Sequence, residues 1–250
     1  MVYLISDVHG DYDLFVKLLK KINFSKNDKM IILGDMLDKG KKSIELLNLL
    51  FGENSKNFEC IMGNHEYDFV KYYHTLVRSK LYNEEQIVRH CNDRLDVVEG
   101  LTIDMIKRIE SLPFYIETED YICVHAGVPL DDEDNILDVS KAEKEELVYG
   151  RSFKAPLILP KGKCVVFGHT PTFYMGGEIE IIAYKKDSEI GNKMSDYYKI
   201  HIDTGSYLTG VLGCWCVDEC KAYYVNKWQN WCVFMFYDIK LRFFCKCQMS

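Results

Sequence analysis

The most constraining feature of this sequence is a repeated pairing of a short apolar run with a polar residue beside glycine. Residues 2–5, 30–33 and 58–62 are rich in strand-favouring side chains, and each run ends at such a polar residue. Two segments between them, 14–22 and 44–50, carry apolar residues at helical spacing. The resulting βαβαβ order predicts an α/β fold in which helices cover a parallel sheet.

The same pairing returns later in the chain, at residues 121–124, 164–167 and 199–202. Because ligands bind beyond the carboxyl ends of the strands in open α/β sheets, we expect the polar residues to gather at one rim. Residues 67–112 are more polar and helical in pattern, so we interpret them as a helical insertion that covers one edge of this rim. We expect residues 206–250 to be strand-like and rich in aromatic side chains.

Composition limits the classes of function. The chain has 250 residues, a formal net charge of −7 and 48% hydrophobic residues, which indicates one soluble globular domain. The acidic balance argues against a stable nucleic-acid complex, although bound metal ions would still admit a phosphorylated substrate. The start has no signal-peptide pattern, and no run reaches the roughly 18 apolar residues that span a bilayer. We therefore expect a cytoplasmic protein without membrane insertion.

The ten cysteines are expected to be free thiols, since disulfides are rare in the cytosol. Two C-x-C pairs, Cys214/Cys216 and Cys245/Cys247, leave open a structural zinc or a redox pair. The spacing of Cys214 and Cys216 also fits one face of a strand, which is the interpretation we favour.

The polar residues at the strand ends have the chemistry of metal ligands. In an extended turn the side chains of Asp7 and His9 would point the same way, toward one cation. Asp35 could bridge two ions with its two oxygens. Mixed nitrogen and oxygen donors without thiolate favour Mn²⁺, Fe²⁺ or Zn²⁺ over a structural zinc. The candidate metal ligands are Asp7, His9, Asp35, Asn64, His125 and His169.

Neighbouring residues supply the other parts of a hydrolytic site. His65 follows a candidate ligand directly and could protonate a leaving oxygen, while Asp38 could orient its imidazole and raise its pKa. Lys39 and Arg151 are candidates for binding phosphate oxygens, together with Asn64. Two ions roughly 3.5 Å apart could share a bridging water and clamp the phosphoryl group.

These motifs, in this order, resemble the phosphoprotein phosphatase family of metallophosphoesterases, the serine/threonine phosphatases, and are most similar to its small bacterial and phage members. The family pattern is GDxHG, GDxxDRG, GNHE, HAG and GH. The matching segments are SDVHG (6–10), GDMLDKG (34–40), GNHEYD (63–68), HAG (125–127), YGRSF (149–153), FGHT (167–170) and IDTGS (202–206).

The resemblance implies a calcineurin-like sandwich, with two central β-sheets flanked by helices and a dinuclear site that holds Mn²⁺, or alternatively Fe²⁺ or Zn²⁺. It makes His65 and Asp38 the catalytic acid pair and Arg151 a phosphate contact. It also implies a serine/threonine protein phosphatase that works by direct attack of a water bridging two metal ions. The catalytic domain would span residues 1–225, and residues 226–250 would be a β-rich extension packed on it.

Lys39 stands where the family pattern has arginine, so the bidentate phosphate contact of a guanidinium is lost. This departure leaves open a symmetrical dinucleoside tetraphosphatase or another nucleotide phosphoesterase. A catalytically silent binding scaffold is the remote alternative. The aromatic residues of the C-terminal extension could form a homodimer surface.

Overall fold

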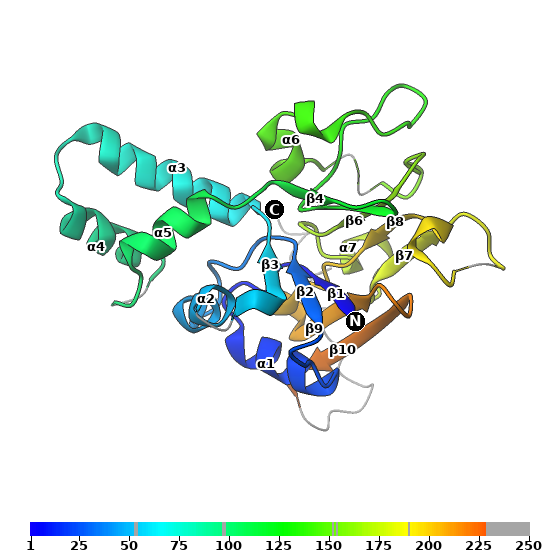
Figure 1. The fold of residues 1–250 in the computed structure, drawn as a ribbon, viewed down its shortest axis with the longest axis horizontal. Helices are drawn as coiled ribbons and strands as arrows, with labels where there is room; N and C mark the ends of the chain where they lie inside the picture. Colours follow the sequence, from blue (N-terminus) through cyan, green and yellow to red (C-terminus); the bar gives the residue numbers. More distant parts are fainter. Residues whose placement is uncertain (53–54, 97–98, 152, 154, 190, 229–250) are drawn as a thin grey trace, which may run out of the picture.

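The computed structural model describes residues 1–250 apart from 53–54, 97–98, 152, 154, 190 and 229–250. Two five-stranded sheets lie at its centre, with helices on their outer sides (Figure 1). The predicted fold class, an α/β sandwich of two sheets flanked by helices, is confirmed.

The first sheet is built around the N-terminal strands, in the order β10-β9-β1-β2-β3. Strands β1, β2 and β3 are parallel, as the βαβαβ pattern predicts, whereas β9 pairs with β1 in antiparallel fashion. The sheet is therefore mixed. Its strands are β1 (Val2–Ile5), β2 (Lys29–Ile32), β3 (Phe58–Cys60), β9 (Val211–Cys216) and β10 (Lys221–Asn226).

The second sheet has the order β4-β5-β6-β8-β7. Its three central strands are parallel and correspond to the three later apolar runs, while β4 and β7 add antiparallel edges that the sequence pattern did not predict. Its strands are β4 (Tyr115–Glu117), β5 (Tyr121–Val124), β6 (Cys164–Phe167), β7 (Ile182–Lys185) and β8 (Tyr197–His201).

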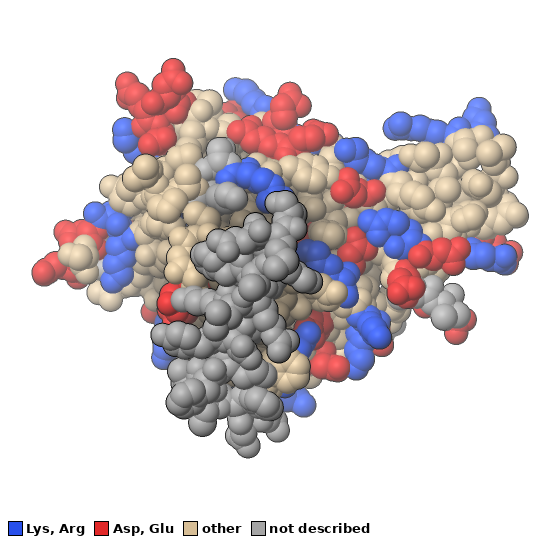
Figure 2. Space-filling model, turned by 180° about the vertical axis from the view of Figure 1, so that it is seen from behind, with Lys and Arg blue, Asp and Glu red and all other residues tan. Residues whose placement is uncertain are grey.

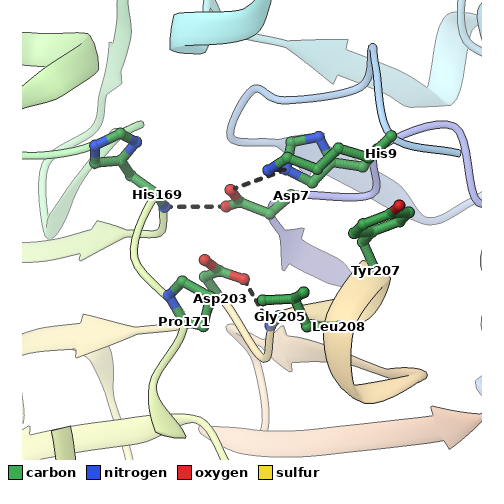
Figure 3. Close-up of a pocket in the computed structure, with 9 residues that line it drawn as sticks. Asp7, His9, His169, Pro171, Asp203, Gly205, Tyr207 and Leu208 are labelled. Atoms are coloured by element: carbon green, nitrogen blue, oxygen red, sulfur yellow. Dashed lines mark hydrogen bonds and ion pairs between the residues drawn. The ribbon is translucent and has the colours of Figure 1, made fainter. Parts of the chain in front are cut away.

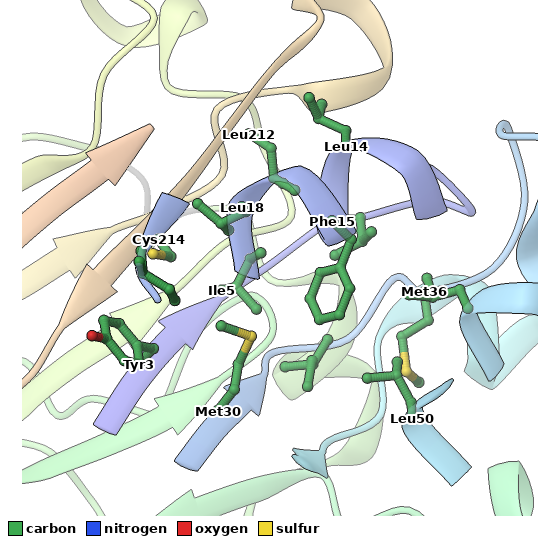
Figure 4. Close-up of a cluster of buried hydrophobic side chains, with 14 of the residues drawn as sticks. Tyr3, Ile5, Leu14, Phe15, Leu18, Met30, Met36, Leu50, Leu212 and Cys214 are labelled. Carbon is green, nitrogen blue, oxygen red and sulfur yellow. The ribbon is translucent and has the colours of Figure 1, made fainter. Parts of the chain in front are cut away.

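Alternation along β1 gives the first sheet two buried faces. Tyr3 and Ile5 pack under helices α1 (Tyr12–Lys21) and α2 (Ser43–Phe51), where Phe15 is fully buried (Figure 4). Leu4 points the opposite way, into the core shared by the two sheets. Fully burying a side chain of this size stabilises the fold by about 1.5–3 kcal/mol.

Three helices form an arm that projects from the sheets in Figure 1. They are α3 (Asn64–Ser79), α4 (Glu84–Arg94) and α5 (Ile103–Glu110), so the segment predicted as a helical insertion contains helices. An apolar cluster that includes Phe69, Ile87 and Ile106 joins them. Within the described ranges the remaining α-helices are α6 (Lys144–Tyr149), α7 (Phe173–Gly176) and α8 (Ser206–Thr209). Helix α8 corrects the expectation that the chain becomes strand-like at residue 206, because the Gly205 and Gly210 turns enclose one helical turn there.

The structure bears on three expectations drawn from composition, which concern the cysteines, the surface charge and membrane-spanning helices. Cys214 and Cys216 are buried on one face of β9, and the cysteines in the described ranges are free. Acidic and basic side chains are interspersed on the face shown in Figure 2. Among the described residues, no helix is both long and apolar enough to cross a bilayer. Cys245/Cys247 and the proposed dimer surface lie outside the described residues, as does the C-terminal extension from residue 229.

Candidate active site

Most of the candidate residues lie in the turns that follow the parallel strands, while Asn64 and His65 begin helix α3 and Arg151 follows helix α6. Six of them have a left-handed backbone, which is uncommon for residues other than glycine and concentrates at functional sites. For Asp7 and His9, with φ of 55° and 49°, this corrects the expected extended turn. Their side chains still converge, with Asp7 Oδ1 3.8 Å from His9 Nε2. The six residues are Asp7, His9, Asp35, Asp38, Lys39 and His169.

Asp35 lies at the centre of the site and is almost fully buried. Its Oδ2 is 3.5 Å from His9 Nε2 and 3.8 Å from His65 Nε2. Its Oδ1 is 3.5 Å from His125 Nε2 and accepts a hydrogen bond from the backbone N–H of His65. One carboxylate oxygen therefore faces the candidate metal ligand His9 and the other faces the candidate ligand His125, as expected of a carboxylate shared by two ions.

Hydrogen bonds hold the imidazole rings of His9 and His125 so that Nε2 of each ring points toward Asp35. The Nδ1 of His9 bonds to the Leu37 carbonyl at 2.9 Å, and that of His125 bonds to the Leu33 carbonyl at 2.7 Å. Because Nδ1 carries the proton in each case, the lone pair of Nε2 points into the site.

The surroundings of Asn64 indicate that a cation would fit here. Its Oδ1 lies 3.0 Å from His125 Nε2 and 2.9 Å from His169 Nδ1. A carbonyl oxygen facing the lone pair of His125 is a contact between two acceptors. The buried Nε2 of His169 also has no hydrogen-bond partner within the described part of the chain. These donors fit divalent metal ions, which accept lone pairs from nitrogen and neutral oxygen.

The pKa shifts of the acidic and imidazole groups in the site also favour bound cations. Burial raises the pKa of Asp35 well above its usual value, and the neighbouring Asp7 and Glu66 raise it further. Burial lowers the pKa of His9 to about 4 and that of His169 to about 3. Crowded carboxylates beside neutral imidazoles favour bound cations, which would hold the acids ionised and take up the imidazole lone pairs.

The predicted acid pair is in contact. His65 Nδ1 lies 2.6 Å from Asp38 Oδ2, and the His65 side chain is 22% exposed. Burial disfavours its charged form, but the bond to Asp38 and the charge of Asp35 outweigh it and raise the pKa of His65. Arg94, from the helical arm, holds the same Asp38 carboxylate through two further bonds.

A cavity of about 200 Å³ opens beside Asp7. Figure 3 shows the Asp7 carboxylate between His9 and His169, with the α8 side chains of Tyr207 and Leu208 forming another wall. Those two side chains are half exposed, at 49% and 51%. The cavity therefore combines a polar floor with an apolar wall. Its other lining residues are Lys39, Pro171, Asp203 and Gly205.

The two candidate phosphate-binding cations both lie near the metal-ligand candidates. Lys39 Nζ is 2.8 Å from His9 Nε2 and lines the cavity. Arg151 is exposed after α6. Its charge contributes to the lowered pKa of His169, behind burial and the neighbouring His125.

Sequence reasoning missed Glu66, although it lies within the GNHE motif. Its buried carboxylate accepts four backbone N–H groups and joins the turn after β2 to the start of α3. The donors are Asp35, Met36, Leu37 and Gly63. The available signal was an acid three residues after Gly63, the N-cap position of a helix, where a glutamate side chain accepts a hydrogen bond from the N-cap backbone N–H.

A profile of the family described as calcineurin-like phosphoesterase matches residues 1–196. Curated relatives include the symmetrical bis(5'-nucleosyl)-tetraphosphatase of Buchnera aphidicola subsp. Schizaphis graminum, 30% identical over 128 residues that cover 51% of this chain and 44% of that protein. The enzyme of the same name from Wigglesworthia glossinidia brevipalpis is 29% identical over 147 residues, covering 58% and 52%. The chain thus spans about half the length of the curated relatives it matches.

Solved structures share the fold at low sequence identity. A crystal structure of a candidate diadenosine tetraphosphatase aligns with a TM-score of 0.64 and 16% identity, covering 92% of this chain and 94% of that one. A cold-active protein-tyrosine phosphatase of a psychrophilic Shewanella species aligns with a TM-score of 0.55 and 16% identity, covering 90% and 80%. Enzymes named for nucleotide and for phosphoprotein substrates therefore share this architecture.

Proposed function

Because the chain belongs to the calcineurin-like phosphoesterase family, we propose that it is a metal-dependent phosphoester hydrolase that cleaves dinucleoside tetraphosphates symmetrically. The observation that carries hydrolysis is the position of Asp35, whose Oδ2 faces the ring of His9 and whose Oδ1 faces the ring of His125. The names of the curated relatives and the apolar wall of the cavity support the nucleotide substrate.

Two divalent ions, with Mn²⁺ as the first candidate, would supply Lewis acidity and a water of lowered pKa. Asp7, His9 and Asp35 would hold one ion, and Asp35 would be shared with the other. The ligands of that second ion would be Asp35, Asn64, His125 and His169.

The chain's own groups would bind the substrate and move the proton. His65 would hold a proton on Nε2, which is on the Asp35 side of its ring, and donate it to the leaving oxygen. Asp38 would accept the Nδ1–H and stabilise the imidazolium. Lys39 and Arg151 would bind the phosphate oxygens from two sides.

The wall of Tyr207 and Leu208 suits a planar group carried by the phosphate chain. An aromatic ring packed on a nucleobase contributes about 1–3 kcal/mol at sites where this has been measured by substitution. Lys39 lines the same cavity and could neutralise the adjoining phosphate. Its ammonium is less demanding in geometry than the guanidinium of the GDxxDRG pattern, which suits a flexible polyphosphate.

A serine/threonine protein phosphatase is the second candidate. GDMLD followed by GNHE favours it, because these segments supply the acid pair that a poor alkoxide leaving group needs. The open position of Arg151 would also admit a peptide.

Side-by-side turnover with Mn²⁺ tests the proposal. Diadenosine tetraphosphate should be cleaved to two molecules of ADP, faster than phosphate is released from a phosphothreonine peptide. Preference for the peptide would overturn the nucleotide proposal and keep hydrolysis. If the chain binds Mn²⁺ but hydrolyses none of the three substrates (the dinucleotide, the peptide and p-nitrophenyl phosphate), the result would favour a catalytically silent binding scaffold.

Two variants sharpen the comparison. Tyr207→Ala should raise the KM for the dinucleotide about tenfold, which corresponds to one lost stacking contact, and should leave p-nitrophenyl phosphate hydrolysis almost unchanged. Tyr174→Ala removes another half-exposed tyrosine, on α7 and outside the residues that line the cavity, and serves as the matched control.

A further inference from the structure

The Asp38 carboxylate is bound by Arg94 as well as by His65, its partner in the proposed acid pair. Its Oδ2 lies 2.6 Å from His65 Nδ1, while Arg94 donates from Nη1 to Oδ1 at 2.8 Å and from Nη2 to Oδ2 at 3.2 Å. We propose that Arg94 is a positioning residue for the acid: its two bonds fix the plane of the Asp38 carboxylate so that Oδ2 faces His65. This inference rests on the proposed function, since it assigns a role to Arg94 in that same proton transfer.

The need for such a clamp follows from the bonding of Asp38. A carboxylate held by His65 alone could rotate about its last torsion, because terminal carboxylate torsions are broad. Asp38 also has a left-handed backbone, with φ of 63°, in the turn that follows β2. The planar fork of a guanidinium fixes both oxygens at once, whereas an ammonium offers a single point of charge.

The helical arm holds Arg94 in place. Arg94 is the last residue of α4, and its side chain is one-third exposed. One turn earlier Cys91 is fully buried, and Ile87 and Leu95 lie in the same apolar cluster, which joins α4 to α3 and α5. The packing of the arm therefore sets where the guanidinium lies, and the arm becomes part of the catalytic apparatus.

Charge supports the same arrangement. Burial alone would favour the neutral form of Asp38, but its hydrogen bonds to His65 and Arg94 lower its pKa to about 2. The carboxylate thus stays ionised beside the imidazole. Arg94 is 56 residues away in the chain, so no local motif reveals the pair.

The test combines Arg94→Met, Arg94→Lys, Asp38→Asn and the double variant Arg94→Met/Asp38→Asn in the full chain with Mn²⁺. Phenyl phosphate and p-nitrophenyl phosphate serve as substrates, because protonation of the leaving oxygen matters more for the poorer leaving group. Arg89→Met, on the same helix, is the control, since Arg89 is 70% exposed and pairs only loosely with Glu85 at 3.7 Å.

Arg94→Met should lower kcat for phenyl phosphate about tenfold, lower that for p-nitrophenyl phosphate about threefold, and change KM less than twofold. In the Asp38→Asn background it should cause no further loss, since the two residues act as one unit. Arg94→Lys should recover only part of the rate. Arg89→Met should match the unsubstituted chain.

A spectroscopic signature separates positioning from general structure. In the metal-free chain, where no paramagnetic Mn²⁺ broadens nearby protons, the downfield resonance of the His65 Nδ1–H is assigned by its loss in His65→Asn. It should broaden in Arg94→Met and persist in Arg89→Met. Should Arg94→Met fold poorly, Arg94→Lys carries the same comparisons.

Additive losses in the Asp38→Asn background, equal losses on both substrates, or an unchanged Arg94→Met rate would each overturn the inference while the unsubstituted chain remains active. An inactive unsubstituted chain would instead count against the proposed function. In that case the persistence or broadening of the His65 resonance would still decide whether Arg94 orders the pair.

Discussion

Replacement of Glu66 by glutamine should uncouple the metal-ligand turns from one another. Glu66 is fully buried, and each carboxylate oxygen accepts two backbone N–H groups. Oε2 receives those of Asp35 and Gly63, and Oε1 receives those of Met36 and Leu37. A glutamine amide has one oxygen, so its NH₂ group must face one of these two pairs of donors.

The size of the effect follows from the bonds that are lost. Two hydrogen bonds to a charged acceptor are removed, each contributing about 1.5–3 kcal/mol, and two backbone N–H groups are left buried without partners. The lower cost of burying a neutral amide offsets part of this loss. We expect Glu66→Gln to lower the free energy of unfolding by about 3 kcal/mol, a large share of the 5–15 kcal/mol that typically stabilises a domain.

Urea unfolding of the metal-free chain measures this change directly. Glu117→Gln is the matched control, because Glu117 is a half-exposed acid that forms an ion pair with Lys163 at 2.9 Å and should contribute less than about 1 kcal/mol. A loss below 1 kcal/mol for Glu66→Gln, equal to that of the control, would refute the assigned role of Glu66.

Three further predictions follow from other parts of the structure. Asp35→Ala should reduce bound Mn²⁺, measured by elemental analysis, and lower turnover more than about 100-fold, the upper end of losses from removing a supporting partner; unchanged Mn²⁺ content would exclude a bridging role. Gly34→Ala should cost about 3 kcal/mol or more in thermal unfolding, because φ is +84° and the new Cβ would lie 2.5 Å from the Gly63 Cα; an unchanged melting temperature would contradict this. Burial lowers the pKa of Lys199 from 10.5 to about 8, so between these pH values the unfolded chain binds the extra proton and stability gains with rising pH. Relative to Lys199→Met, the unsubstituted chain should therefore become more stable in urea titrations from pH 8 to pH 10, and a constant difference would count against the shift.

The parallel strands and the residues after them could be predicted because both signals are local. An apolar run followed by a polar residue and glycine marks the carboxyl end of a buried strand, and parallel topology brings such ends together. His125 and His169 follow neighbouring parallel strands of the second sheet and meet for this reason, whereas Asp35 follows β2 of the first sheet and joins them because the two sheets pack together. The helices of the arm were likewise predictable, because residues 67–112 contain few turn signals.

Features that depend on distant partners could not be predicted from local pattern. The antiparallel edge strands β4 and β7 are short, and only their neighbours in the sheet stabilise them. The turn at Asp7 and His9 was expected to be extended, but backbone bonds to the turn after β2 hold it left-handed. The clamp of Arg94 on Asp38 joins segments whose proximity is set by the packing of the whole arm.

Titration of Mn²⁺ into the metal-free chain, followed by electron paramagnetic resonance, tests most directly whether Asp35 joins two metal positions. We predict two ions per chain with magnetic coupling, so that the signal is weaker than that of two isolated ions. The coupling should be lost in Asp35→Ala. A single bound ion, or two uncoupled ions, would contradict a dinuclear centre at this site.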